Sequence, residues 1–501
     1  MESPKKWITK NLFAWSRRCA KAAQLMTTDG GPEKSFSEAA YRKSQLIEAT
    51  ARELFPGGVD VAGTQHLPFP AFVDYTQELI AKTTNPVIYQ ACFQRGHTRG
   101  KVDILVLGPK KWQLYDVISR TRVEEEDILG LGFLAELVQA CYPAIKVEAG
   151  LIHLNTDYVL VDQLDICRLF KIVDLTTRVR LVKPLVQKYL SVAERIIEEE
   201  TTITTNIGLQ CKKPYECPFL NHCWAHIPEP SVFEISRLWE VKKFKLYEQG
   251  IVHLQDLPRQ VKLNNKQWLQ VDSTLQKRVI VDTEAIHKFV AEVEYPLYFL
   301  DFETFQPPVP RYQKTKAYSQ ICFQYSLHRL DSPLAELKHL EFLAQAKGDF
   351  RLSFLQNLLT ALNHHGTILA YNQKFEAGRL QELAQVFPEY ESEISRVIHR
   401  MKDLMRPFED RSLYHPQQKG SVSLKVVLPA WVPELSYAGL NIGNGVAASE
   451  QFEKLAQSFT SRAEKQQIRR DLLAYCKMDT YAMVRLWQVL EKIAQEYQTA
   501  A

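Results

Sequence analysis

The spacing of apolar and polar residues predicts alternating helices and strands in the first half of the chain. Apolar positions recur at intervals of three and four over 126–141, which is typical of a helix, and helices are also predicted over 13–26 and 41–54. Short apolar runs rich in β-branched and aromatic residues predict strands at 87–93, 102–107, 112–118 and 151–155. This pattern indicates an α/β module of roughly 200 residues.

The pattern changes twice after that module. Pro228 and Pro230 interrupt the chain, and lysines and arginines then accumulate among helical patterns up to about residue 290, which indicates a basic helical connector. The apolar run YPLYFLDFETF then starts a second α/β module, predicted as strand, strand, helix, strand and helix up to about residue 495. We therefore expect a first module over 1–227, a connector over 228–292 and a second module over 293–497.

Composition narrows the class of protein without naming a partner. The chain has 501 residues, of which 46% are hydrophobic, so several cores are expected and wholesale disorder is excluded. Its formal net charge of +4 is too small to indicate a polyanion or a membrane surface, so any nucleic-acid contact must be local. We see no secretory signal and no membrane span, and nine cysteines are too few for a disulfide scaffold, so we expect a cytoplasmic protein.

Two acidic residues end the first strand of the second module. Asp301 and Glu303 are two positions apart, so both side chains point to the same face of the strand. Neighbouring carboxylates repel each other unless a cation lies between them, and oxygen ligands of this kind suit Mg²⁺ or Mn²⁺. An acidic pair at a solvent-exposed strand end would look the same, so more acids are needed to decide.

Further acids follow at suggestive positions. Glu376 lies in the first turn of a predicted helix, and Tyr475 and Asp479 are four residues apart on one helical face. The segments DFET, YNQKFE and YCKMD together resemble the three exonuclease motifs of the DnaQ-like superfamily, in the subtype whose third motif is Tyr-x-x-x-Asp.

The DnaQ-like resemblance implies an RNase H-like fold and a two-metal 3′-to-5′ exonuclease. Asp301, Glu303, Glu376 and Asp479 match the ligands of two Mg²⁺ or Mn²⁺ ions, and Tyr475 matches the residue that positions or deprotonates water. Glu376 departs from the motif, which more often has an aspartate there. Asp403 and the Ser-Leu-Lys stretch of GSVSLKVVLP also match superfamily features, but local capping explains them equally well, so we leave them outside the catalytic set.

Three cysteines close the first module. Cys211, Cys217 and Cys223 lie in one run that contains two prolines, which predicts a turn-rich loop able to gather its thiols around one centre. The run resembles that of RecB-like nucleases with a 4Fe-4S cluster, and by that resemblance Cys19 is the fourth ligand. A zinc site completed by His222 or His226, or cysteines without any ligand, are the alternatives.

The RecB-like resemblance also implies a nuclease core between those cysteines. Asp103 and Asp116 match its acidic positions, but Ile118 stands where the family has a lysine, and Leu131 or a neighbour replaces a glutamine. An isoleucine cannot stabilise developing negative charge, so we expect a degenerate nuclease fold kept for binding or structure, with Arg120 or Arg122 as the available substitutes.

Both halves together resemble a family of uncharacterised bacterial proteins that joins an iron-sulfur RecB-like module to a DnaQ-like exonuclease domain. The connector segment KLYEQGIVHLQDLP also resembles a helix-hairpin-helix piece, whose backbone N–H groups can hold phosphates. The resemblance implies a nuclease of DNA or RNA, single-stranded or with a 3′ end, whose first module binds the substrate. The alternative is an inactive nucleic-acid-binding or complex-forming adaptor with a structural cluster.

Overall fold

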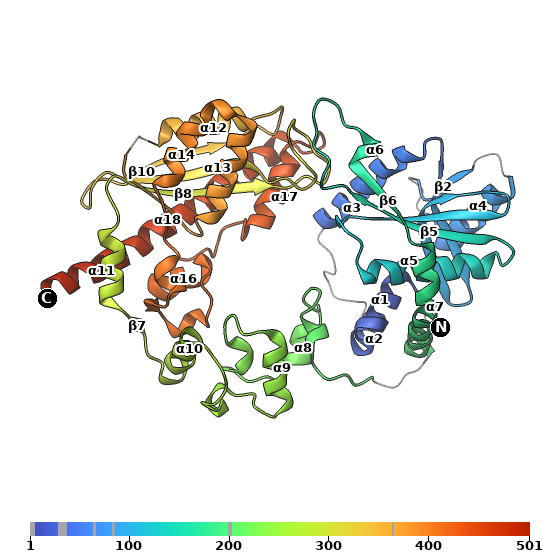
Figure 1. The fold of residues 1–501 in the computed structure, drawn as a ribbon, viewed down its shortest axis with the longest axis horizontal. Helices are drawn as coiled ribbons and strands as arrows, with labels where there is room; N and C mark the ends of the chain where they lie inside the picture. Colours follow the sequence, from blue (N-terminus) through green and yellow to red (C-terminus); the bar gives the residue numbers. More distant parts are fainter. Residues whose placement is uncertain are drawn as a thin grey trace. The chain divides into compact units, whose positions relative to one another are not determined.

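The computed structural model describes residues 6–28, 38–63, 67–82, 86–198, 203–362 and 365–500. The chain forms two compact units of mixed α/β structure, as the sequence predicts (Figure 1). The first unit comprises Met1–His226 with Pro307–Ser319, and the second comprises Ile227–Gln306 with Gln320–Ala501. The first break in the chain therefore falls one residue before the predicted boundary, and the connector folds as part of the second unit.

The first unit is built on a six-stranded sheet in the order β1-β2-β3-β4-β5-β6. Its strands are β1 (Val59–Asp60), β2 (Val87–Arg95), β3 (Thr98–Val106), β4 (Lys111–Ile118), β5 (Lys146–Leu154) and β6 (Phe170–Asp174). The β1/β2 and β4/β5 pairs are parallel, and the other neighbours are antiparallel. The parallel β4/β5 pair needs a crossover, which the predicted helix supplies as α5 (Glu125–Cys141).

Helices cover both faces of this sheet. One face packs against α4 (Phe69–Lys82), α5 and α7 (Thr176–Glu198), around a core that includes Phe133 and Leu151. Helices α1 (Lys10–Arg18) and α2 (Ala20–Thr28) pack against α7 and add to the same core. The other face packs against α3 (Glu38–Ala51) and Ala317 of the 307–319 segment. The remaining helices of the unit are α6 (Ile166–Leu169) and α8 (Leu220–Trp224).

The prediction of one continuous helix over 13–26 is wrong. The chain leaves helical geometry at Cys19, whose φ is −163° and ψ is 110°, and starts α2 at Ala20. The apolar periodicity continues through this break because both helices bury residues in the same core. Periodicity reports which side of the chain is buried, and it does not reveal a single extended residue.

The second unit contains a five-stranded mixed sheet in the order β10-β9-β8-β11-β12. Its strands are β8 (Leu297–Phe305), β9 (Ile321–Leu330), β10 (Lys338–Leu343), β11 (Thr367–Ala370) and β12 (Met401–Asp403). The central strand β8 pairs antiparallel with β9 and parallel with β11. Strand β10 is an edge strand that the sequence prediction missed, because none of its residues is fully buried and its apolar signal is weak.

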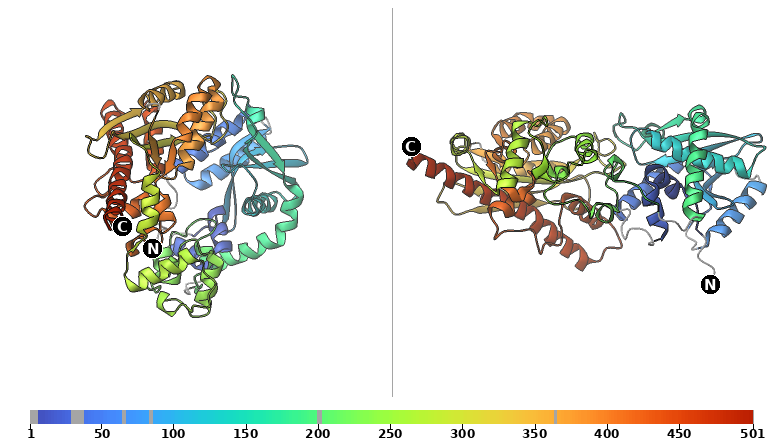
Figure 2. Two further views of the ribbon diagram at one scale, coloured as in Figure 1. Left: turned by 60° about the vertical axis from the view of Figure 1, so that its left-hand side comes forward. Right: turned by 90° about the horizontal axis from the view of Figure 1, so that it is seen from below.

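Alternate residues of β8 face different helices, as a period of two requires. Leu297 and Phe299 pack with α11 (Thr283–Ala291), α16 (Leu424–Trp431) and α18 (Arg462–Ala500). Tyr298 and Leu300 pack with α12 (Arg351–Ala361), α13 (Lys374–Val386) and α14 (Glu391–His399). Figure 2 shows the same helices from two further directions.

The rest of the second unit is helical apart from one small sheet. Its other helices are α9 (Glu240–Glu248), α10 (Asn265–Gln276), α15 (Arg406–Glu409) and α17 (Gly445–Leu455). Strands β7 (Ile280–Val281) and β13 (Leu413–Tyr414) pair antiparallel and join the connector to the rest of the unit. Within the residues that the structure describes, no helix has the length and apolar character needed to cross a membrane.

Candidate metal centre

Three elements of the second unit carry the predicted acids. Asp301 and Glu303 lie near the end of β8 on the face that packs with α18, because they continue the odd-numbered positions of Leu297 and Phe299. Glu376 lies in the first turn of α13 and Asp479 lies in the middle of α18. Glu303, Glu376 and Asp479 are buried, with exposed fractions of 7%, 2% and 7%, so three of the four carboxyl groups have little access to solvent.

The structure brings these four carboxyl groups together. Burial raises the pKa of Asp301 well above its usual range, and repulsion from Asp479, Glu303 and Glu376 adds to the rise. Burial and the same kind of repulsion raise the pKa of Glu303 to about 8. Burial also raises the pKa of Glu376 to about 8 and that of Asp479 to about 6. Without a bound cation the cluster therefore keeps protons at neutral pH.

One carboxylate oxygen in the cluster has no partner in the chain. Oε2 of Glu376 is buried and makes no hydrogen bond. The possible ligand atoms of Asp301, Glu303 and Cys476 all lie within 4.8 Å of one another. Buried polar atoms are normally satisfied, so an unpartnered acceptor beside other carboxylates fits a site for a hard cation.

Cys476 is a neighbour that the sequence analysis did not single out. Its Sγ lies 3.5 Å from Oδ2 of Asp301, close enough for the thiol to donate a hydrogen bond. Burial raises the pKa of Cys476 well above its usual range, and the Asp301 carboxylate raises it further. The residue therefore stays a neutral thiol, and carboxylate oxygens remain the better ligands for Mg²⁺ or Mn²⁺.

A hydroxyl network surrounds Asp479. Tyr437 donates a hydrogen bond of 2.6 Å to Oδ1 of Asp479, and Lys425 donates one of 2.8 Å to the hydroxyl oxygen of Tyr475. Lys425 also donates to the backbone carbonyl of Gly443. Burial raises the pKa of Tyr475, and the Asp479 and Glu303 carboxylates raise it further, so its hydroxyl keeps its proton at neutral pH. The phenol is thus suited to orienting water and not to acting as a base.

Of Lys425 and Tyr437, only Lys425 carries a signal in the sequence. Lys425 belongs to the Ser-Leu-Lys stretch that resembles a superfamily feature, so its position carried a signal. Tyr437 lies between helices without any pattern, and only the folded chain places it beside Asp479. Asp403 accepts hydrogen bonds from the backbone N–H groups of Asn372 and Met405, each at 3.0 Å, but the N-cap of α15 is Met405, so Asp403 holds the loop after β11 and does not cap that helix.

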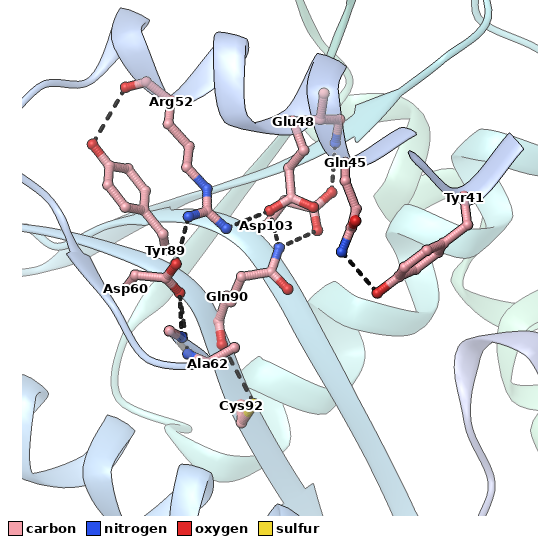
Figure 3. Close-up of polar contacts among 12 residues, drawn as sticks. Tyr41, Gln45, Glu48, Arg52, Asp60, Ala62, Tyr89, Gln90, Cys92 and Asp103 are labelled. Atoms are coloured by element: carbon pink, nitrogen blue, oxygen red, sulfur yellow. Dashed lines mark hydrogen bonds and ion pairs between the residues drawn. The ribbon is translucent and has the colours of Figure 1, made fainter. Parts of the chain in front are cut away.

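The first unit holds a second group of acids, from Asp103 on β3, Asp116 on β4 and Glu48 on α3. The amide nitrogen of Gln90 bridges Glu48 and Asp103, with 3.1 Å to Oδ1 of Asp103 (Figure 3). The other Asp103 oxygen accepts a hydrogen bond of 2.8 Å from the backbone N–H of Val117. Burial raises the pKa of Asp103 well above its usual range, and repulsion from Asp116 and Glu48 adds to the rise.

Lys10 supplies a cation to this second group. It lies at the start of α1, and its ammonium forms an ion pair with Oδ2 of Asp116. Burial disfavours its charge, but attraction to Asp116 and Asp103 outweighs burial and raises the pKa of Lys10. Gly130 of α5 makes room for it, since a Cβ there would lie 2.9 Å from Cε of Lys10. The acids of this group are thus paired with a lysine that lies more than a hundred positions before residue 118 in the sequence.

The arginines proposed as substitutes make other contacts. Arg120 forms an ion pair with Asp127 of α5, and Arg122 pairs with Glu124 through bonds near the surface. The hydrogen bonds of both guanidinium groups are therefore made to acids outside the Asp103 and Asp116 pair. Proximity in sequence favoured these two residues, whereas helix packing brings Lys10 to the site.

The four predicted cysteine ligands lie near one another in the first unit. Burial raises the pKa of Cys217 and of Cys223, and Cys211 and Cys19 each add a smaller rise to both. Cys19 occupies the break between α1 and α2, and the backbone N–H of Cys217 donates to the carbonyl of Cys211. His222 and His226, the alternative zinc ligands, are both exposed. The thiols belong to two segments that Arg18 also links, since it donates to the carbonyl of Gln210 at 2.8 Å.

Known proteins similar to this chain give little functional information. Residues 298–423 match a domain of unknown function, DUF2779, which includes Asp301, Glu303 and Glu376 and ends before Tyr475. Over 220 residues, or 40% of this chain, the sequence is 24% identical to the uncharacterized protein UU173 of Ureaplasma parvum serovar 3. That match spans 31% of the relative, less than a third of its length. The crystal structure of SSO0001 aligns with 46% of this chain and 90% of its own, at 12% identity and a TM-score of 0.20.

Proposed function

We propose that the second unit is a metal-dependent 3′-to-5′ exonuclease with an RNase H-like fold. The observation that carries this proposal is the convergence of four carboxyl groups from β8, α13 and α18, with one buried Glu376 oxygen left without a partner. A mixed sheet with helices on both faces is consistent with the fold that the three motifs imply. Two Mg²⁺ or Mn²⁺ ions bound here would activate the attacking water and neutralise charge on the leaving 3′ oxygen.

The side chains around the carboxylates have separate tasks in this proposal. Asp301, Glu303, Glu376 and Asp479 hold the cations, and Tyr475 orients the water through its hydroxyl oxygen. Lys425 fixes that phenol by its 2.8 Å hydrogen bond. Tyr437 donates to Oδ1 of Asp479 at 2.6 Å, and this hydrogen bond orients the carboxylate that would hold the metal.

Asp479→Asn tests this assignment with little change in shape. We expect the variant to lose chelator-sensitive release of nucleotides from a labelled 3′ end, because an amide is a far weaker ligand for a hard cation. Glu496→Gln is the matched control, since Glu496 is an exposed acid near the end of the same helix. Full activity of Asp479→Asn, with thermal unfolding like that of the wild type, would contradict the proposal. A protein that retards DNA and RNA without digesting either would instead be the adaptor.

For the first unit we propose a RecB-like fold that binds nucleic acid and carries a 4Fe-4S cluster on Cys19, Cys211, Cys217 and Cys223. Zinc holds thiolates at about 2.3 Å, which places their sulfurs less than about 4 Å apart. The proximity of Cys19 and Cys211 to both Cys217 and Cys223 supports a shared centre, and the resemblance of the cysteine run to RecB-like nucleases favours the cluster over zinc. Anaerobic protein should be brown and absorb near ~400 nm. A colourless preparation containing zinc would reject the cluster.

A second candidate activity is metal-dependent nuclease chemistry in the first unit itself. The contact between Lys10 and Asp116 favours it, because a cation beside the acids was the part that the sequence lacked. Residual nuclease activity in Asp479→Asn that disappears on adding Asp116→Asn would support this activity. A double variant that digests nucleic acid as fast as Asp479→Asn would leave the first unit with a binding role alone.

A further inference from the structure

A pocket of about 610 Å³ opens beside the start of helix α10, within the second unit. Its lining includes Ser236, Arg237, Asn265, Lys266, Glu409 and Arg411. These residues are distinct from the carboxylate cluster and from the hairpin segment that resembles a helix-hairpin-helix piece. The volume falls in the range of small-molecule sites, which is roughly 300–1,000 Å³.

The first turn of α10 lines this pocket with Asn264, Asn265, Lys266 and Gln267. The Asn264 side chain accepts from the N–H of Gln267 at 2.9 Å, and the Gln267 side chain accepts from the N–H of Asn264 at 3.0 Å. The next two N–H groups, those of Asn265 and Lys266, have no acceptor in the described structure. Free N–H groups at the start of a helix of 12 residues favour an anion, and the helix dipole adds to that preference.

Arg411 gives an independent sign of a missing ligand. Only 6% of the residue is exposed, and its Nη2 donates to the Ser236 hydroxyl at 2.9 Å and to the Gly420 carbonyl at 2.7 Å. Its Nε and Nη1 are buried and make no hydrogen bond. The guanidinium packs on the ring of Tyr414 at 4.5 Å. A buried guanidinium with unused donors beside a pocket is expected to have an acceptor there.

The charges around the pocket favour a phosphate group. Arg237 pairs with Glu409 at 2.5 Å and Lys266 pairs with Asp410 at 2.8 Å, and the lysine pair is half exposed. The charges within each of these two pairs cancel, so the charge of Arg411 remains as one uncompensated positive charge beside the pocket. A phosphodiester carries one negative charge and several acceptor oxygens, which matches that charge and the unused donors.

We propose that this pocket binds a phosphate group between the N-terminus of α10 and the Arg411 guanidinium. The phosphate belongs to a nucleic-acid strand or to a free nucleotide, since both present the same oxyanion. The phosphate site shares no residue with the metal centre, so it can be tested independently of the exonuclease proposal.

Binding of defined phosphates to the full chain tests the pocket. Inorganic phosphate, a nucleoside monophosphate and a short single-stranded oligonucleotide are titrated without Mg²⁺, with Asp479→Asn as the background for the oligonucleotide. We expect Lys266→Ala to weaken each affinity by about 5-fold, and Arg411→Lys to weaken it by about 10-fold because the fork of donors is lost. Lys277→Ala removes the same charge at the other end of α10 and should change affinity by less than about 2-fold.

The three ligands separate the two sources of phosphate. A free nucleotide that binds as tightly as the oligonucleotide identifies a nucleotide site, and much tighter binding of the oligonucleotide identifies a strand contact. Either result supports the pocket if Lys266→Ala and Lys277→Ala differ as expected. The absence of any phosphate binding by the wild type, or equal losses in those two variants, overturns it. Lys266→Glu provides a second exposed variant should Arg411→Lys fail to fold.

Discussion

The two units each bury a group of acids, but they compensate the negative charge in different ways. In the first unit, Lys10 pairs with Asp116, and Gln90 bridges Asp103 and Glu48. In the second unit, Asp301, Glu303, Glu376 and Asp479 repel one another, and the described residues offer only thiol and hydroxyl donors in direct contact with them. The first group thus has a lysine in direct contact, whereas the cations nearest the second group, Lys425 and Arg379, lower the pKa values of its acids less than burial raises them.

This difference has a functional consequence. A lysine that is already bonded to an acid can support chemistry or simply anchor a helix, so Lys10 alone does not decide between the two roles. A cluster that must hold protons at neutral pH is destabilising unless a cation replaces them. The second unit is therefore the part whose acids are explained better by a ligand than by folding.

Replacing one acid by its amide in each unit should give the largest difference in exonuclease rate. Asp301→Asn is expected to lower exonuclease activity by roughly 10³-fold, because it removes a ligand from the metal pair. Asp116→Asn should leave the second unit's activity within about 2-fold, because it changes only the first-unit site. Rates of 3′-end release at saturating Mg²⁺ make the comparison, and equal losses in the two variants would contradict it.

Removing the Tyr475 hydroxyl should have an intermediate effect. Tyr475→Phe is expected to lower kcat by about 10- to 100-fold with metal affinity unchanged, because the phenol orients water and is not a ligand. The measurement is kcat together with the Mg²⁺ concentration for half-maximal rate. A large shift in that Mg²⁺ concentration would assign Tyr475 to the metal site. Tyr481→Phe is a matched control six residues further along α18.

The raised carboxyl pKa values predict that stability depends on pH in the metal-free protein. Glu303 and Glu376 have pKa values of about 8 and Asp479 of about 6, raised mainly by burial, whereas the unfolded chain ionises these groups near ~4. Between pH 4 and 8 the folded state holds more protons than the unfolded state, so the free energy of unfolding falls as pH rises.

Thermal unfolding of two proteins checks this pH dependence. In Glu303→Gln the free energy of unfolding should fall less as pH rises. Its Tm at pH 8 should exceed that of the wild type by about 3 °C without metal. Mg²⁺ should stabilise the wild type more at pH 8 than at pH 6, because metal competes with protons for the carboxylates. A wild type and Glu303→Gln with identical pH profiles would show that this carboxyl group is not shielded from solvent.

Changes at Lys10 should have the smallest effect, a decrease in the stability of the first unit. Lys10→Met leaves the buried Asp116 without its partner and should lower the free energy of unfolding by about 1–2 kcal/mol. Gly130→Ala should displace only the flexible end of Lys10, and the higher helix propensity of alanine offsets that displacement, so stability should change by less than about 1 kcal/mol. Chemical denaturation measures both, and Lys183→Met on the same unit is a control, since its pair with Glu136 is more exposed. Unchanged stability in Lys10→Met would mean that solvent screens the ion pair.

Local patterns in the sequence were enough for the inner strands of both sheets and for which acids share a strand face, but they missed the edge strands β1, β6, β10 and β12. The apolar run of β8 alternates its contacts between two helical layers, so the common orientation of Asp301 and Glu303 followed from a period of two. The same reasoning placed Tyr475 and Asp479 on one side of α18. These features depend on neighbours within a few residues, which is the range over which periodicity carries information.

Partners distant in sequence came only from the packed structure. Tyr437 reaches Asp479, Lys10 reaches Asp116, and Arg411 lies beside the start of α10, and none of these pairs shares an element or a repeat. A hydrogen bond or ion pair forms wherever packing brings two polar atoms within about 3 Å, and no spacing in the chain encodes that meeting. Local spacing predicts the inner strands, most of the helices and the face on which each acid lies, whereas packing between distant segments determines which acids have a cation, which have a hydroxyl and which have neither.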